Sequence, residues 1–246
     1  EYIIVDGGST DGSLEIIRKY ADRVSWWVSE PDSGQAEALN KGLSRAQGEI
    51  VAWLNSDDLY LPGAVLQAVE IMRANSQLGM VFGDAITIDL HGKPLKKLAF
   101  GDWQLPELLE FRIICQPAVF MRRSILEGID FLDTSYEVML DHHLWIKMAR
   151  VAPIKHIPKI WAAARHHPEA KNVSRAATFA QETLRILEWI QNQSDLIPIV
   201  AESRNEILGG AYRLTARYLL EGGLPAEALK FYARALRYYP SFACQH

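Results

Sequence analysis

The stretch GEIVAWLNSDD, residues 48–58, decides the fold class of this chain. Its apolar run, residues 50–54, has the length of a central strand covered on both faces, and it leads directly into polar residues 55–58. A second short run, YIIV at residues 2–5, stops at DGG, residues 6–8, as a strand does when it ends in a turn. Both runs predict strands with acidic residues at their carboxyl ends.

Helical spacing of apolar residues follows these strands. It is present over residues 14–20 and 36–43, and a helix is expected to open at Pro62 before the next strand at residues 80–82. This alternation predicts an α/β domain with a mostly parallel sheet. Ligands of such sheets bind beyond the carboxyl ends of the strands, so the acidic residues there indicate a binding site.

Composition excludes several classes of protein. The chain has 246 residues, of which 49% are hydrophobic and 23% charged, as in globular proteins with a substantial core. A net charge of −4 argues against a nucleic-acid partner bound through a basic face. Cys115 and Cys244 are too few for a disulfide framework, which favours a reducing compartment. No apolar run approaches the roughly 18 residues of a spanning helix.

The C-terminal part of the chain has a different pattern. Residues 178–191, 205–220 and 226–239 each have the spacing of an amphipathic helix. We therefore expect an α/β domain at residues 1–174 and a helical region at residues 175–246. The last two helices resemble one tetratricopeptide-type repeat. A single repeat is not a stable array, so the pair either packs onto the preceding domain or continues a longer array.

Asp57 and Asp58 are adjacent carboxylates directly after the predicted strand. Carboxylate oxygens suit Mg²⁺ or Mn²⁺, which would neutralise a diphosphate leaving group. The alternative is a solvated turn before a helix, because Asp is also a good helix cap. The pair alone does not decide between the two.

Three stretches together resemble the family 2 glycosyltransferases, inverting enzymes with the nucleotide-sugar-binding GT-A fold. They are YIIVDGGSTDGS at residues 2–13, DSGQAEALNKG at residues 32–42 and GEIVAWLNSDD at residues 48–58. Their order and spacing match the family, and the likeness continues more loosely to about residue 171. The resemblance implies a GT-A mixed, mostly parallel sheet, and a sequence that lacks the first strand and helix of the family.

The resemblance implies a role for each matching residue. Asp58 would coordinate the metal ion, Mn²⁺ or Mg²⁺, together with His167. The residues implied to contact the nucleotide sugar are Asp6, Asp32, Lys41, Asp57, Asp84, Arg165 and Lys171. Asp6 would accept a hydrogen bond from the base, or alternatively from the turn at Gly7 and Gly8. Asn55 replaces an Asp common in relatives, which removes one negative charge from the site.

The segment LDHHLW, residues 140–145, resembles the region that carries the catalytic base. Asp141 matches the residue that takes the proton from the acceptor hydroxyl. Its alternative role is to cap the helix that follows, which is compatible with catalysis. A zinc site at His142 and His143 is disfavoured, because adjacent side chains point in different directions.

The resemblance thus implies a metal-dependent inverting glycosyltransferase with a UDP-, GDP- or dTDP-sugar donor and a glycan or lipid-linked acceptor. The family default is surface polysaccharide or glycolipid assembly in the cytoplasm, with peripheral association at the inner face of the membrane. Two alternatives stay open. One is a nucleotidyltransferase-like enzyme, and the other is a non-catalytic module whose C-terminal helices bind a protein partner.

Overall fold

The computed structural model describes residues 1–166 and 175–243. Its largest sheet has six strands: β3 (Ile50–Val51), β4 (Leu59–Tyr60), β5 (Met80–Ile88), β6 (Pro94–Leu98), β7 (Val119–Arg122) and β8 (Ile154–Arg165). The order is β3-β7-β5-β8-β4, and β6 pairs with β5 off this path. The longest ladder, β5 with β8, is parallel. The ladders β3–β7, β4–β8, β5–β6 and β5–β7 are antiparallel, so this is a mixed sheet.

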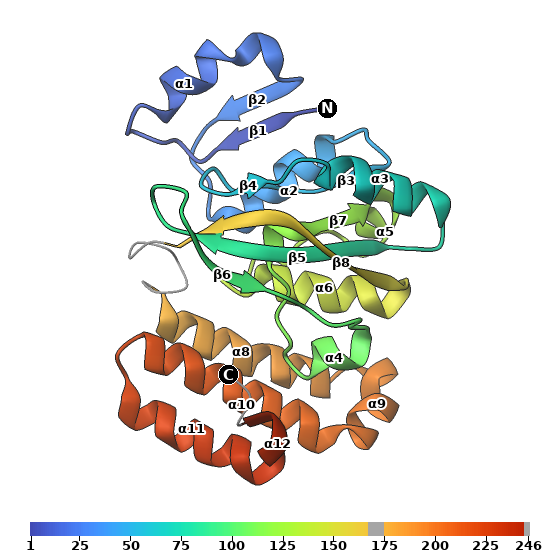
Figure 1. The fold of residues 1–246 in the computed structure, drawn as a ribbon, viewed down its shortest axis with the longest axis vertical. Coiled ribbons are helices and arrows are strands. Elements are labelled where there is room, and N and C mark those ends of the chain that lie inside the picture. The colour runs from blue at the N-terminus through green and yellow to red at the C-terminus, as the bar shows by residue number, and fades with distance from the viewer. Residues whose placement is uncertain (167–174, 244–246) are drawn as a thin grey trace.

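A separate two-stranded parallel sheet is formed by β1 (Ile3–Asp6) and β2 (Trp26–Ser29). It lies at one end of the molecule beside α1 (Ser13–Lys19) (Figure 1). Within the described residues, β1 pairs only with β2 and β3 pairs only with β7. The space between β1 and β3 is therefore not bridged by strand pairing.

The prediction of a central strand over residues 50–54 is wrong. Only Ile50–Val51 form a strand, and β3 ends the hydrogen-bonded order of the six-stranded sheet in the described part of the chain. Its ladder with β7 has two residue pairs, Ile50 with Arg122 and Val51 with Met121. Trp53 is still buried, because its ring stacks on Trp145 with 5.2 Å between the ring centroids.

Helices cover both faces of the six-stranded sheet. In the α/β part they are α2 (Gln35–Arg45), α3 (Ala64–Ala74), α4 (Leu105–Leu109), α5 (Arg123–Gly128) and α6 (Leu140–Val151). Successive residues of a strand point to opposite faces. Accordingly Val81 of β5 packs into the apolar cluster with α3, whereas Phe82 packs into the larger cluster with α6. Strand β5 is therefore packed between α3 on one face of the sheet and α6 on the other.

The C-terminal region consists of α8 (Ala176–Gln191), α9 (Ile197–Glu202), α10 (Arg204–Glu221), α11 (Pro225–Tyr238) and α12 (Pro240–Ala243). The three helices expected from apolar spacing are thus confirmed. Helices α8 and α10 lie beneath α6 in Figure 1. Ile186 and Leu214 belong to the same buried cluster as Trp145 of α6. The helix pair α10–α11 therefore belongs to a bundle that packs onto the α/β part.

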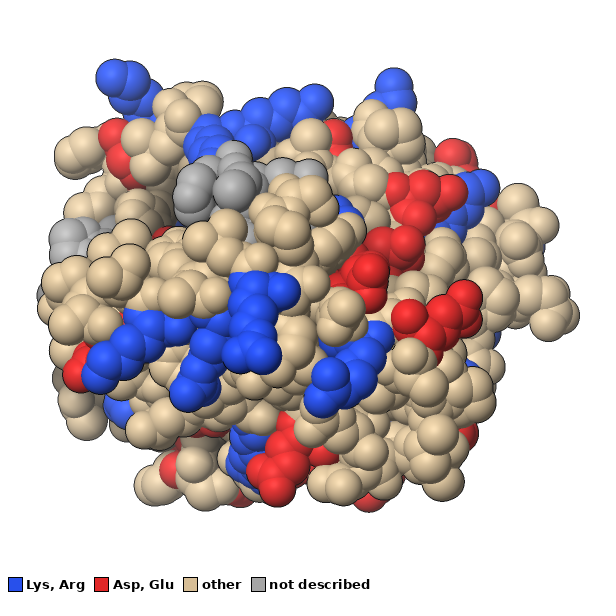
Figure 2. Space-filling model, turned by 90° about the horizontal axis from the view of Figure 1, so that it is seen from below, with Lys and Arg blue, Asp and Glu red and all other residues tan. Residues whose placement is uncertain are grey.

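The outer face of this bundle carries both signs of charge. Figure 2 shows Lys and Arg side chains gathered near the middle of the face, with Asp and Glu side chains beside them. In the part of the chain that the structure describes, no helix has the length and apolar character needed to cross a membrane. Part of the apolar surface of α8 and α10, including Ile186 and Leu214, is buried in the cluster that contains α6.

Gly210 of α10 lies directly against the backbone of Glu110 in the α/β part. A Cβ atom there would lie 1.9 Å from the backbone oxygen of Glu110. We expect Gly210→Ala to lower the free energy of unfolding in urea by about 1–3 kcal/mol, because backbone must shift to admit the methyl group. Gly128→Ala in α5 is the matched control. Its Cβ meets nothing within 4 Å, so it should be neutral or stabilising by up to about 1 kcal/mol. Equal stability of the two variants would contradict this packing.

Candidate functional site

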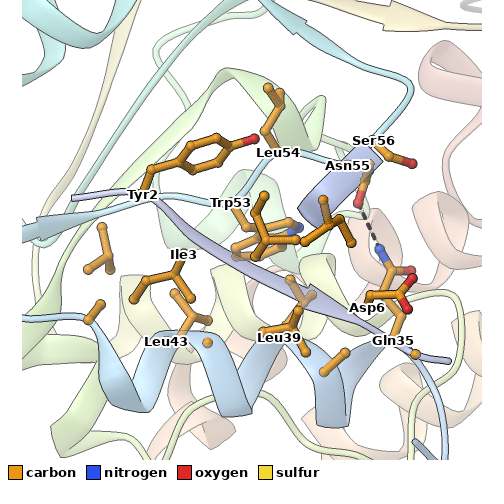
Figure 3. A pocket seen from close by; sticks show the side chains of 18 of the residues that line it. Tyr2, Ile3, Asp6, Gln35, Leu39, Leu43, Trp53, Leu54, Asn55 and Ser56 are labelled. Atoms are coloured by element: carbon orange, nitrogen blue, oxygen red, sulfur yellow. Dashed lines mark hydrogen bonds between the residues drawn. The ribbon is translucent and has the colours of Figure 1, made fainter. Parts of the chain in front are cut away.

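A groove of about 1030 Å³ runs between β1 and β3. Its walls come from β1, α1, α2, β3 and the segment that follows β3. Figure 3 shows apolar side chains, including Leu39, Leu43 and Trp53, along its length. Polar side chains gather at one end: Asp6, Gln35, Asn55 and Ser56. This is the end at which β1 and β3 terminate, as expected for a ligand site of an α/β sheet. Asp57 also lines the groove.

Asp6 organises the turn after β1. Its carboxylate accepts hydrogen bonds from Ser29 Oγ (2.6 Å), Ser9 Oγ (2.5 Å) and the backbone N–H groups of Ser9 and Gly8. These bonds, led by that of the Ser29 hydroxyl, lower the pKa of Asp6 and keep it ionised. The turn-acceptor role that the sequence left open is confirmed. The residue also lines the groove, where base recognition stays a prediction.

Asp32 lies against the same turn. A Cβ atom on Gly7 would be 2.6 Å from Asp32 Oδ2, so the two loops touch through a residue without a side chain. Asp32 also accepts a hydrogen bond from the Gly34 N–H. Lys41 is oriented differently. Its ammonium group donates to Glu30 at 2.6 Å, and this bond raises its pKa. Neither residue is among those that line the groove.

Asp58 is buried, whereas its neighbour Asp57 is half-buried and lines the groove. Asp58 Oδ1 accepts a hydrogen bond from the backbone N–H of Arg165 (2.9 Å), and Oδ2 accepts one from the Asn55 amide (3.2 Å). Burial raises the pKa of Asp58, and the charge of Asp57 raises it further. A divalent cation beside these carboxylates would offset both effects.

The carboxylates of Asp57 and Asp58 are suitable ligands for Mg²⁺ or Mn²⁺. Mg²⁺ commonly takes one or two protein carboxylates and completes its shell with water and substrate phosphates. Among the described residues, no group of three or more His, Cys, Asp or Glu side chains gathers at one point. His167 and Lys171, which the sequence assigned to metal and donor, lie outside the described residues.

Arg165 fixes the position of the acidic pair. Besides its backbone contact with Asp58, its Nε donates to the carbonyl of Asp57 at 3.0 Å, and its Nη1 donates to the carbonyls of Asp89 and Leu90. These bonds occupy the guanidinium group with backbone oxygens. Asp84 is occupied as well. It is buried in β5, 2.8 Å from His156 Nε2, and accepts the Phe100 N–H. It lies outside the groove lining.

Asp141 is in the first turn of α6 and is partly buried. The alternative that it caps this helix is wrong, because the N-cap residue is Met139. Its Oδ1 accepts the N–H of the adjacent His142 (2.7 Å). Burial raises the pKa of Asp141 to about 6, and the charge of Glu182 contributes in the same direction. Such a carboxyl group is suited to accept a proton near neutral pH.

Gln116 lies against the segment that leads into the acidic pair. Burial raises the pKa of the Cys115 thiol to about 12, and the charges of Asp58 and Asp141 both add to this shift. The Gln116 amide donates to the Trp53 carbonyl at 2.9 Å and accepts from Asn55. Sequence patterns did not indicate these hydrogen bonds of Gln116, because its partners lie about sixty residues earlier in the chain.

His142 and His143 pack among aromatic rings. The ring of His142 lies 5.5 Å from that of Phe111, and the ring of His143 lies 4.5 Å from that of Trp189. Burial lowers the pKa of His142 to about 3 and that of His143 to about 4, so both are neutral at pH 7. They act as core residues, in keeping with the sequence argument against zinc.

The mixed α/β sheet with acidic side chains after its strands agrees with a GT-A fold, which the solved structures described below share. The family model of glycosyl transferase family 2 matches residues 1–130, and the chain belongs to this family. An uncharacterized glycosyltransferase of Rickettsia conorii is 28% identical over 181 residues, which are 69% of this chain and 30% of that protein. A PGL/p-HBAD biosynthesis glycosyltransferase of Mycobacterium bovis is 29% identical over 57% of this chain and 55% of its own length.

Solved structures share the fold at low sequence identity. The crystal structure of S. aureus TarS superposes with a TM-score of 0.60 at 16% identity, over 99% of this chain and 47% of that chain. The mannosyltransferase PcManGT of Pyrobaculum calidifontis, in complex with GDP-Man and Mn²⁺, superposes with a TM-score of 0.58 at 20% identity, over 98% of this chain and 72% of that chain. The chain thus spans less than a third of the Rickettsia relative.

Proposed function

We propose that this protein is a metal-dependent, inverting glycosyltransferase that moves a sugar from a nucleotide diphosphate sugar to an acceptor hydroxyl. One observation carries the proposal. The segment that carries Asp57–Asp58 packs against the helix that carries Asp141, through the stacked rings of Trp53 and Trp145, and it borders a groove that ends at Asp6. TarS 1–349 in complex with UDP-GlcNAc and PcManGT in complex with GDP-Man and Mn²⁺ support a nucleotide-sugar donor.

Each carboxylate has a separate task in this mechanism. Asp141, with its pKa raised to about 6, is ionised at pH 7 and takes the proton from the attacking hydroxyl. Asp58 and Asp57 hold Mn²⁺ or Mg²⁺, which when bound neutralises the diphosphate leaving group. Arg165 keeps the pair in place, because its backbone N–H donates to the Asp58 carboxylate and its Nε donates to the Asp57 carbonyl.

The remaining donor contacts are proposed by the same logic. Asp6 receives the base at the polar end of the groove, and Asp32 supports the turn that holds it. Lys41, Asp84, Arg165 and Lys171 act on the donor, and His167 on the metal. For Lys41, Asp84 and Arg165 this requires that they exchange their present partners, Glu30, His156 and backbone carbonyls, for donor atoms. The GT-A domain covers residues 1–174, and residues 175–246 form a helical region with one tetratricopeptide-like pair. We place the reaction in glycan or glycolipid assembly on a lipid-linked or glycan acceptor, at the cytoplasmic face of the membrane.

Release of nucleoside diphosphate tests the proposal. The protein is incubated with Mn²⁺ and, in turn, UDP-glucose, UDP-GlcNAc, GDP-mannose and dTDP-glucose. We expect one of these donors to yield nucleoside diphosphate, and EDTA to abolish the release. Release of pyrophosphate from a nucleoside triphosphate and a sugar phosphate would instead identify a nucleotidyltransferase. Neither product, together with no binding of any donor, would identify a non-catalytic module.

A further inference from the structure

Glu182 is a buried carboxylate in the middle of α8, on the side of the helix that faces the α/β part. It accepts three backbone hydrogen bonds from the loop that leads into α6. The Glu137 N–H donates to Oε1 at 2.7 Å, and the N–H groups of Val138 and Met139 donate to Oε2 at 3.0 and 2.8 Å. Met139 is the residue at which α6 begins. A side chain of the C-terminal region thus ends on the first turn of the helix that carries Asp141.

These bonds satisfy backbone N–H groups at the start of α6. The first N–H groups of a helix have no partner within it, and α6 has no side-chain cap of its own. A carboxylate at this position satisfies such groups and interacts favourably with the positive end of the helix. A buried carboxylate is costly unless it is fully hydrogen-bonded, and the three N–H groups supply those bonds. The contact therefore specifies one position of the loop relative to α8.

Two arginines also bind this loop, Arg185 within α8 and Arg175 at its N-cap. Arg185 donates to the carbonyl (2.9 Å) and the hydroxyl (2.5 Å) of Ser135. Arg175 pairs with Glu137 at 2.8 Å. Residues 135–139 are thus held by α8 at three points, just before Asp141.

We propose that Glu182 is a positioning residue for Asp141, so that the C-terminal helical region is a working part of the transfer site. The proposal rests on the proposed function, in which Asp141 is the base. A shift of about 1 Å in a reacting group is enough to cost roughly a hundredfold in rate. A loop that is free to move at residues 137–139 would allow such a shift, because Asp141 follows within one turn.

The charge of Glu182 provides a readout that a purely structural contact would not move. Glu182 raises the pKa of Asp141. The other titratable groups near Asp141 are Cys115 and Tyr218, whose pKa values burial raises so that both are neutral at pH 7, and the neutral His142. Removal of the Glu182 charge therefore lowers the pKa of Asp141. Because a general base works in its ionised form, the acid limb of the rate profile moves to lower pH.

Glu182→Gln tests the proposal, since the amide keeps the volume but loses the charge and one acceptor atom. We expect kcat to fall about ten- to a hundredfold with the donor KM unchanged, and the acid limb to move to lower pH. Asp195→Asn is the matched control. It removes the pair Arg150–Asp195 (2.6 Å), which joins the other end of α6 to the C-terminal region, and should keep the wild-type pH profile. Wild-type kinetics for Glu182→Gln, or the same loss in both variants, would overturn the proposal.

Hydrogen exchange separates this proposal from the proposed function. The amides of residues 137–139 should exchange faster in Glu182→Gln than in the wild type, and at the wild-type rate in Asp195→Asn. Absence of transfer by the wild type with every donor would refute the proposed function, and with it the base role of Asp141. Unchanged exchange in Glu182→Gln would refute the positioning contact alone. Should Glu182→Gln fail to fold, Arg185→Gln releases the same loop from its exposed side, and unchanged kcat there would count against the proposal.

Discussion

Asp141→Asn should abolish sugar transfer and leave donor binding nearly intact. The amide has the shape of the carboxyl group but does not accept a proton near neutral pH, and loss of a general base costs about 10²- to 10⁴-fold in rate. Since the pKa of Asp141 is raised to about 6, wild-type kcat should rise with pH through this value, and the residual rate of the variant should lack that rise. Initial rates from pH 5 to 8, with donor affinity by calorimetry, measure both.

Stability provides the control for this variant. The folded-state pKa of Asp141 is above the ordinary value of 3.8, so the folded protein holds the proton more tightly than the unfolded chain. The ionised side chain therefore costs stability, and the cost develops as pH rises from about 4 to about 6. Asp141→Asn carries no such charge. It should be at least as stable as the wild type at pH 7, and a large loss of stability would invalidate it as a test of the base.

Local sequence patterns predicted the helices well. The apolar residues of α6, among them Leu144 and Met148, recur at helical spacing, and they are buried because α6 lies between the sheet and the C-terminal bundle. Local patterns also identified the acidic pair 57–58, because the two carboxylates are adjacent in the sequence. The turn at Asp6 follows from the glycines next to it.

Pairing over long distances was not predictable in this way. The position of β3 at the edge of the sheet depends on which strands pair with it, and residues 50–54 carry no information about those neighbours. Arg165 is tied to carbonyl groups that come more than seventy residues earlier, so its charge alone suggested a phosphate contact. Glu182 did leave a signal. An acidic residue in the apolar stripe of an amphipathic helix, next to Phe179 and Ile186, indicates a buried charge that requires a partner.

Asp58→Asn should remove the metal dependence of donor binding. Asn keeps the side-chain volume and an oxygen that accepts the Arg165 N–H, but it lacks the negative charge that attracts a divalent cation. Because a metal at a diphosphate contributes several kcal/mol, we expect kcat/KM to fall more than about a hundredfold. Titration of the donor with and without Mn²⁺ should show that Mn²⁺ tightens binding in the wild type and not in the variant.

The two aspartates can be told apart by the same titration. Asp141→Asn should retain the Mn²⁺-dependent gain in donor affinity that Asp58→Asn loses, because the proton acceptor is needed only when the acceptor hydroxyl reacts. Burial and the charge of Asp57 raise the pKa of Asp58, so without metal the loss of the charge favours the folded state and offsets the loss of the hydrogen bond from Asn55. Equal donor affinity of both variants in Mn²⁺, with folding intact, would mean that the acidic pair does not hold the cation and that the assigned division between metal ligand and base is wrong.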